Sequence, residues 1–278
     1  MGRQVFFLSR VVSFLLILVL TILTFFPFYW ALVSSLKTEL NIFKIPPEWI
    51  PLDPTLSNYV NLLQRTKTVA WTTNSFIVSL SAVILTCALS AVSGYAFAHI
   101  AFSGKSLIFG CIIATMLLPK YVMLVPLFKL MLKLDWFDTY QGMVIPEVAG
   151  ALPLGIFLIR QFMSTQPKEI FESATIDGCN EGHLLVLIAI PLAKPAIASL
   201  GILIFVRSWN DYMWHLIVIS KDVMKTLPLG LASLQTENVT LYGQILSGAM
   251  IAALPLILVF ILFQKYFVRG LSSGAVKG

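Results

Sequence analysis

The segment that decides the fold of this chain runs from Thr165 to Pro195 and reads TQPKEIFESATIDGCNEGHLLVLIAIPLAKP. It carries four acidic residues in a chain that is otherwise largely apolar. Pro167 suits the first turn of a helix, where its missing N–H costs nothing. Asp177-Gly178 is a strong helix stop, because glycine accepts the positive φ that ends a helix. We therefore predict a short helix, a glycine turn and a second helix.

Three apolar residues, Ile170, Phe171 and Ala174, recur at helical spacing in the first predicted helix and form an apolar stripe. Glu169 and Glu172 favour the positive end of the same helix. A helix–turn–helix between membrane spans with one apolar face is interpreted as a docking surface. An ordinary amphipathic linker is the alternative.

The composition indicates an integral membrane protein. The chain has 278 residues, of which 58% are hydrophobic and 12% charged, and its mean hydropathy is +0.88. Soluble domains carry about 25% charged residues. The net charge of +6 comes without a basic cluster that contains aromatic residues, so it predicts contact with anionic lipid and no nucleic-acid partner. The three cysteines have no metal or redox spacing.

Six segments reach the roughly 20 apolar residues that a membrane-spanning helix needs. They cover about 11–34, 73–100, 107–130, 140–162, 196–220 and 243–267. We predict an all-α integral membrane protein with six transmembrane helices, forming one domain over 1–278 with both termini on the same side. Segments 37–68, rich in proline, and 221–242 are expected outside the membrane.

Two of the predicted spans contain helix breakers. The third is interrupted at Leu118-Pro119-Lys120-Tyr121, and the fourth contains Pro146-Glu147, Gly150 and Pro153. Broken helices at membrane depth are tolerated where they line a cavity or are buried in protein. These breaks therefore predict a cavity.

The fifth predicted span contains three titratable residues, Arg207, Asp211 and His215. Their spacing of four residues places them on one face of a continuous helix. Charges at this depth are costly and are functional by default. They would line a transport path or form ion pairs that lock neighbouring helices together, and the sequence leaves both interpretations open.

One pattern in the segment Thr165–Pro195, called the polar segment below, resembles the cytoplasmic EAA loop of ABC-importer permeases. The residues that match its order and spacing are Glu172, Ala174, Asp177, Gly178, Ile188 and Pro191. The chain departs from the family pattern at Ser173, Cys179, Leu185 and Ile190, which remain small or apolar.

The resemblance covers nearly the whole chain and is closest to the second, six-span permease of maltose-type sugar importers. The motifs that carry it are Gly94–Ala98, Val125–Leu127, Phe157–Phe162, Trp209–Asp211 and the tail Gly270–Gly278. It implies a type I ABC-importer permease fold with a cytoplasmic coupling helix, in a bacterial or archaeal cytoplasmic membrane. It also implies cytoplasmic termini.

The resemblance further implies a second permease subunit, two ATPase subunits that bind ATP and magnesium, and an extracytoplasmic sugar-binding protein. This chain would carry a carbohydrate, hold no cofactor or metal, and have no catalytic residue. The matched loop residues would dock on the ATPase. For the substrate path we select Lys120, Tyr121, Glu147, Trp209, Asn210 and Tyr212, because sugars are held by aromatic faces and a few polar groups.

Two other functions are weighed. A secondary transporter would couple protons or ions through Glu147, Arg207 and Asp211, but such folds show internal repeats, and none is evident. A membrane enzyme would need a metal-ligand pair or a nucleophile motif, and the three histidines form no such pair. Gly104-Lys105-Ser106 lacks the first glycine of a phosphate-binding loop, so no nucleotide site is expected in this chain.

Overall fold

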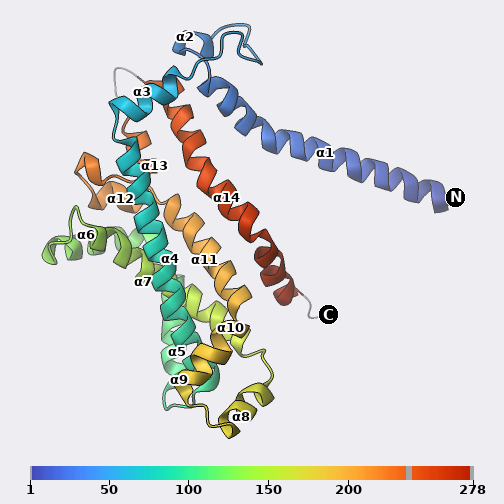
Figure 1. Cartoon of the computed structure of the whole chain (residues 1–278), viewed down its shortest axis with the longest axis vertical. Coiled ribbons are helices and arrows are strands. Elements are labelled where there is room, and N and C mark those ends of the chain that lie inside the picture. The colour runs from blue at the N-terminus through green and yellow to red at the C-terminus, as the bar shows by residue number, and fades with distance from the viewer. Residues whose placement is uncertain (1, 236–239, 276–278) are drawn as a thin grey trace. The chain divides into compact units, whose positions relative to one another are not determined.

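A computed structural model describes residues 2–235 and 240–275, and these residues are mostly helical with no β-strand among them (Figure 1). The prediction of an all-α membrane fold is confirmed. The described chain forms two compact units. One comprises Met1–Thr68 with Leu231–Leu254, and the other Val69–Gly230 with Pro255–Gly278.

The first unit contains helix α1 (Gly2–Ser35), the short helices α2 (Glu39–Ile42) and α3 (Ser57–Arg65), and the start of α14 (Tyr242–Ala275). Polar contacts tie these elements together. The buried amide of Asn58 donates to the carbonyl oxygens of Ser35 and Lys37 at 2.9 and 2.7 Å. The backbone N–H of Gly243 donates to Glu39 Oε1 at 2.8 Å. The proline-rich segment is therefore an ordered connection.

The second unit is built on three long helices, α4 (Thr68–His99), α7 (Tyr140–Met163) and α11 (Lys194–Trp209). A Cβ added to Gly94 of α4 would lie 2.7 Å from Ile159 Cγ2 of α7. A Cβ added to Gly155 of α7 would overlap the Ser90 hydroxyl of α4 and approach Leu200 of α11 to 3.3 Å. Small residues thus let α7 pack tightly against both neighbours, as such residues do between membrane helices.

The third predicted span is broken where the sequence indicates. Helix α5 (Lys105–Ala114) and the turn η1 (Thr115–Leu117) form its first arm, while η2 (Lys120–Met123) and α6 (Leu124–Lys133) form the second. The two arms meet at 94°. By contrast, α7 stays continuous through its internal prolines, Pro146 and Pro153, so the break expected in the fourth span does not occur.

The fifth predicted span is not one helix. Helix α11 ends at Trp209, and α12 (Met213–Val218) follows after a short non-helical stretch. The side-chain amide of Asn210 donates to the Val206 carbonyl at 2.8 Å, and Asp211 Oδ1 accepts from the Trp214 N–H at 3.3 Å. Side chains that take over backbone partners in this way compete with the helical ladder. Asp211 and His215 therefore do not continue the helix that carries Arg207.

The polar segment folds as predicted, as a helix, a glycine turn and a second helical run. Helix α8 (Lys168–Ile176) ends before Gly178, whose φ is +87°. The second run comprises α9 (Glu181–His183), the π-helical η3 (Leu184–Ala189) and α10 (Ile190–Leu192), and it meets α11 at 72°. The side chain of Asn180 accepts from the His183 N–H and begins this run.

The remaining elements are η4 (Asp222–Met224) and α13 (Leu227–Ala232). Four single helices are long and apolar enough to cross a membrane, namely Val12–Ser35, Thr68–His99, Tyr140–Met163 and Tyr242–Gln264. With each bent pair counted as one span, the described residues provide six, in agreement with the predicted number. The prediction of a single domain stays a prediction.

Candidate functional site

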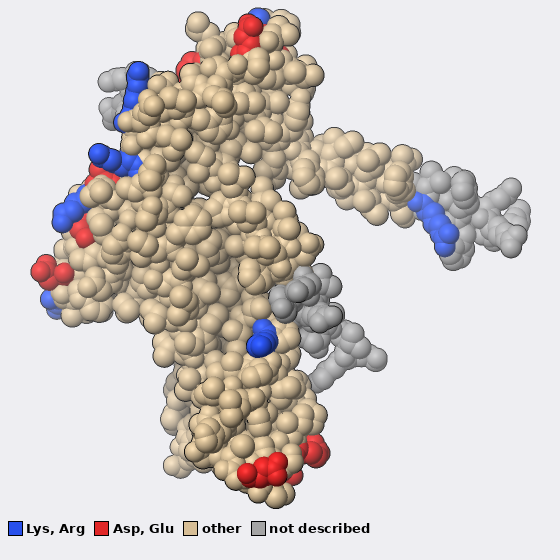
Figure 2. All heavy atoms as spheres, in the orientation of Figure 1, with Lys and Arg blue, Asp and Glu red and all other residues tan. Residues whose placement is uncertain are grey.

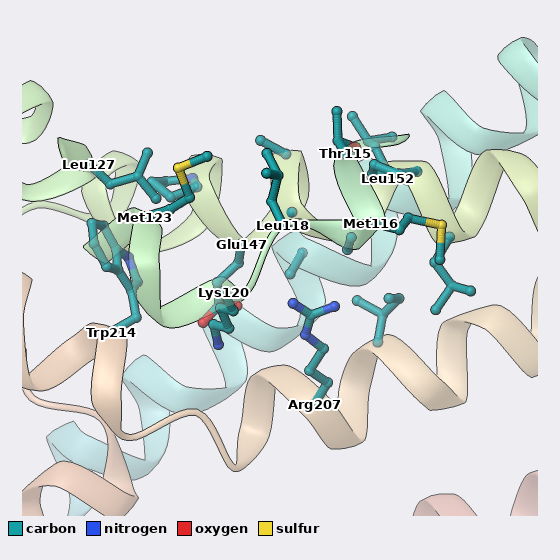
Figure 3. A pocket seen from close by; sticks show the side chains of 18 of the residues that line it. Thr115, Met116, Leu118, Lys120, Met123, Leu127, Glu147, Leu152, Arg207 and Trp214 are labelled. Carbon is teal, nitrogen blue, oxygen red and sulfur yellow. The ribbon is translucent and has the colours of Figure 1, made fainter. Parts of the chain in front are cut away.

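A cavity of about 870 Å³ lies in the second unit, between the broken span, α7 and α11 (Figure 3). Most of its wall is apolar and comes from methionine, leucine, isoleucine and alanine side chains. The charged side chains on this wall are Lys120, Glu147, Arg207 and Asp211. A mostly apolar cavity with a few convergent polar groups is the usual form of a small-molecule site.

An ion pair closes one side of the cavity. Lys120 Nζ donates to Asp211 Oδ2 at 2.6 Å, which joins η2 to the stretch after α11. The side chain of Asp211 is only 6% exposed, whereas that of Lys120 is 43% exposed. The break at Pro119 turns the chain so that Lys120 reaches this buried carboxylate. A buried carboxylate requires such a partner, because an unpaired charge is costly in a low-dielectric setting.

A second polar network extends from Glu147 of α7. Its Oε2 accepts from the Ser208 hydroxyl at 2.5 Å, and its Oε1 lies 3.3 Å from Nε2 of the fully buried His215. The other ring nitrogen of His215 lies 2.6 Å from the Asp211 carbonyl oxygen. The network links α7, the end of α11 and α12. Ion pairs and hydrogen bonds thus lock neighbouring helices here, as one of the two interpretations of these residues required.

The structure brings only some of the predicted path residues to the cavity. Lys120 and Glu147 line it. Trp209 is buried against Phe205 and Phe76, with ring centroids 5.6 and 4.8 Å away. Tyr121, Asn210 and Tyr212 also lie outside the cavity wall. Tyr121 is 67% exposed, Asn210 turns its amide back to its own helix, and Tyr212 is partly buried against the core.

The six selected path residues leave out Ser208 and Trp214 on the wall, and also Arg207, Asp211 and His215, for which the sequence left a transport path and ion pairs open. For Arg207, Asp211 and His215 the sequence signal was a titratable residue inside an apolar span. Continuous helical periodicity could not assign their positions, because the helix stops at Trp209. The break moves Asp211 toward Lys120 and His215 toward Glu147.

The apolar stripe of the polar segment faces the core of this chain and not a partner. Phe171 and Ala174 are 7% and 9% exposed. The Phe171 ring lies 4.0 Å from the ring of His99 and 6.5 Å from that of Tyr95, centroid to centroid. The interpretation of this stripe as the docking face is therefore wrong. Apolar residues that pack against α4 of the same chain recur at the same helical spacing as residues that dock on a partner, so the pattern alone does not separate the two. Only Ile170 keeps some exposure, at 38%.

The outer surface of the segment is acidic. Figure 2 shows acidic side chains at the end of the second unit where α8 lies. The exposed acids are Glu169, Glu172, Asp177 and Glu181. Glu172 has neither a hydrogen bond nor an ion pair with any other residue that the structure describes. Its carboxylate is therefore free to pair with a group outside this chain.

The other matched loop residues divide between the surface and the core. Asp177, Gly178 and Pro191 are exposed, and Ile188 is partly buried against the core. Glu181 Oε2 accepts a 2.7 Å hydrogen bond from the Tyr95 hydroxyl of α4. Within the described part of the chain, no group of three or more His, Cys, Asp or Glu side chains is arranged to hold a metal ion.

Comparison with protein families gives one match that covers most of the chain. Residues 88–273 match the model of the family described as "Binding-protein-dependent transport system inner membrane component". The matched range contains the four charged residues of the cavity wall and the whole polar segment.

Curated proteins of similar length resemble the entire chain. The arabinooligosaccharides transport system permease protein AraQ of Bacillus subtilis is 35% identical over 98% of both chains. The trehalose/maltose transport system permease protein MalG of Thermococcus litoralis is 31% identical over 98% of both chains. The sulfoquinovosyl glycerol transport system permease protein SmoH of Agrobacterium fabrum is 30% identical over 100% of this chain and 97% of its own length.

A solved structure has the same fold. A chain of a bacterial ABC transporter involved in the import of the acidic polysaccharide alginate superposes with a TM-score of 0.83. The superposition covers 94% of this chain and 96% of that chain at 20% identity. The likeness therefore establishes the type of fold.

Proposed function

Because this chain belongs to the family of inner membrane components of binding-protein-dependent transport systems, we propose that it is the permease subunit of an ATP-driven carbohydrate importer. It is a multi-pass membrane protein and forms half of a translocation path. The names of its relatives support a carbohydrate cargo, since arabinooligosaccharides, trehalose, maltose and sulfoquinovosyl glycerol are all sugars or glycosides. An oligosaccharide or another glycoside fits this range.

The proposed assembly contains a second permease subunit, two ATPase subunits and an extracytoplasmic sugar-binding protein. ATP and magnesium bind to the ATPase subunits, and this chain is a transport subunit without catalytic residues. It lies in a bacterial or archaeal cytoplasmic membrane with the polar segment and both termini in the cytoplasm. The exposed acids of α8 support this arrangement, because Glu172 has no partner among the described residues and can pair with an external group.

One structural relationship carries the proposal. The polar segment connects α7 directly to α11, and these two helices form much of the cavity wall. A force applied to α8 by a closing ATPase therefore reaches both sides of the cavity. Gly178, at φ +87°, sets the turn through which this force passes.

The matched loop residues take two roles in this mechanism. Glu172, Asp177, Gly178 and Pro191 lie on the exposed side and contact the ATPase, with Glu172 pairing with one of its basic groups. Ala174 and Ile188 pack toward the core and hold the segment against the spans. Rigid attachment is needed because a loose segment would absorb the ATPase movement without moving α7 or α11.

Uptake by proteoliposomes that contain the assembled transporter and its binding protein tests the proposal. Sugar should accumulate with ATP and magnesium on the ATPase side, and a non-hydrolysable ATP analogue should support no accumulation. Ionophores that collapse proton and sodium gradients should leave uptake unchanged. Uptake that follows the ion gradient and ignores ATP would instead establish a secondary transporter.

A further inference from the structure

The charge balance of the cavity wall leaves one cation without compensation. Lys120 and Asp211 form an ion pair at 2.6 Å, so together they contribute no net charge. Glu147 and Arg207 are the other charged side chains on the wall. Whether Arg207 is compensated therefore depends on the state of Glu147.

The hydrogen bonds around His215 indicate the combined charge of Glu147 and His215. The Asp211 carbonyl oxygen can only accept, so His215 Nδ1 carries the proton of their 2.6 Å hydrogen bond. In a neutral ring, Nε2 then has a bare lone pair, and it lies 3.3 Å from Glu147 Oε1. Both atoms are buried without a hydrogen-bond partner, and two lone pairs repel at this distance, which favours one added proton on Glu147 or on His215. The pair then has zero net charge, whichever of the two residues holds that proton.

Arg207 remains as the uncompensated charge. Figure 3 shows its guanidinium extending from α11 into the cavity. No acidic side chain of the described chain lies within 4.0 Å of it. The end of α11 supplies a partial negative charge, because Arg207 lies in the last helical turn, but a helix terminus is worth only about half a charge.

The space around the guanidinium is open and apolar. A Cβ added to Gly150 of α7 would lie 3.8 Å from Arg207 Nη2, so the guanidinium lies close to α7 at this small residue. Met116 and Leu118 contribute apolar surface to the same wall. The Arg207 side chain is exposed, so a ligand in the cavity can reach it. Arginine also binds a planar carboxylate with two parallel hydrogen bonds.

We propose that the transported carbohydrate carries an anionic group, a carboxylate or a sulfonate, and that Arg207 binds this group in the cavity. The inference rests on the proposed function and narrows its substrate class. A neutral sugar would offer the exposed Arg207 guanidinium no opposite charge.

Competitive uptake tests this inference. Proteoliposomes with the complete transporter and binding protein receive an equimolar mixture of neutral galactotriose, arabinotriose and maltotriose with acidic trigalacturonate, trimannuronate and sulfoquinovosyl glycerol. Mass spectrometry then measures what accumulates inside with ATP. We expect at least one acidic compound to enter in preference to every neutral one. Accumulation of neutral sugars alone overturns the inference and leaves the proposed function intact, whereas ATP-driven uptake of no compound contradicts both.

Variants identify the residue responsible. Arg207→Gln should lower the ratio of acidic to neutral uptake at least about tenfold, since it removes a charge-assisted bidentate contact. Arg207→Lys should recover part of this ratio, and Lys133→Gln, a matched loss of an exposed charge outside the cavity, should not change it. If Arg207→Gln lowers uptake of all compounds equally or separates the two permeases, Arg207 pairs with the partner subunit and the inference is wrong.

Discussion

The hydroxyl of Tyr95 donates a 2.7 Å hydrogen bond to Oε2 of Glu181, across 86 residues of sequence. Tyr95 belongs to α4, and Glu181 is the first residue of α9. Helix α9 lies in the polar segment Thr165–Pro195, which is named the coupling segment below after its proposed role. The segment is therefore held at three places, by its covalent links to α7 and α11 and by this bond to α4. The buried Phe171 ring packs beside the same tyrosine.

Tyr95→Phe should weaken coupling while the fold is retained. The substitution keeps the ring and removes a hydrogen bond to a charged group, which is worth about 1.5–3 kcal/mol. We expect the number of ATP molecules hydrolysed per sugar imported to rise at least about threefold. The measurement compares ATPase and uptake rates of the same reconstituted sample.

Tyr140→Phe is the matched control, because it removes the 2.6 Å hydrogen bond from Tyr140 to Asn74, remote from the coupling segment. It should also lower thermal stability, though less because the acceptor is a neutral amide, and it should leave the ratio of hydrolysis to uptake unchanged. Equal effects of the two variants on this ratio would mean that the Tyr95 bond contributes stability alone.

Comparing Gly178→Ala with Gly182→Ala distinguishes the effect of strain at a positive φ from the effect of replacing any glycine in this segment. A Cβ at Gly178 would contact nothing within 4 Å, so its only cost is the positive φ of +87°, about 1–2 kcal/mol. Gly182 is exposed in the same segment and has an ordinary backbone conformation. We expect Gly178→Ala to reduce sugar-stimulated ATPase activity severalfold and Gly182→Ala to preserve it. Normal stimulation in the first variant would exclude a strict requirement for this turn.

Gly94→Ala should destabilise the second unit. The new Cβ would lie 2.7 Å from Ile159 Cγ2 and 3.0 Å from the Arg160 nitrogen, so α4 and α7 would have to separate. Overpacking of this kind costs about 1–3 kcal/mol. Gly110→Ala in α5 meets nothing within 4 Å and should be neutral or slightly stabilising. Thermal unfolding in detergent micelles measures both, and equal midpoints would contradict the close packing of α4 and α7.

The ion pair of Lys120 and Asp211 predicts unequal effects of its two single substitutions. Lys120→Met leaves a carboxylate that is 6% exposed without a positively charged partner, whereas Asp211→Asn leaves an ammonium that is 43% exposed. The first substitution should therefore lower the free energy of unfolding more than the second.

The double variant tests whether these effects share one interaction. Its cost should fall short of the sum of the single costs by about 1–2 kcal/mol, as for contacting residues. Equilibrium unfolding in mixed micelles of the wild type, both single variants and the double variant measures this double-mutant cycle. Strict additivity would mean that the two side chains do not interact in the membrane-embedded protein.

Local chemistry in the sequence was sufficient for much of the fold. Apolar runs of about 20 residues predicted the spans, because a helix is the only way for such a segment to satisfy its backbone in lipid. Pro119 predicted the break in the third span, and Asp177-Gly178 predicted the turn of the coupling segment. Each signal acts over a few neighbouring residues and needs no knowledge of distant contacts.

The candidate site depended on tertiary structure. The sequence placed Arg207, Asp211 and His215 on one helical face, but side-chain hydrogen bonds of Asn210 and Asp211 end α11 and redirect the chain. Lys120 meets Asp211 across 91 residues, a pairing that no local pattern encodes.

The same limit applies to the coupling segment. Helical spacing identified Phe171 and Ala174 as one apolar stripe, but spacing does not indicate whether a stripe faces a partner or the chain's own core. Only packing against Tyr95 and His99 decided that it faces inward. The sequence by itself thus determined the helices and their turns, whereas tertiary contacts decided which side chains meet, because those partners are far apart along the chain.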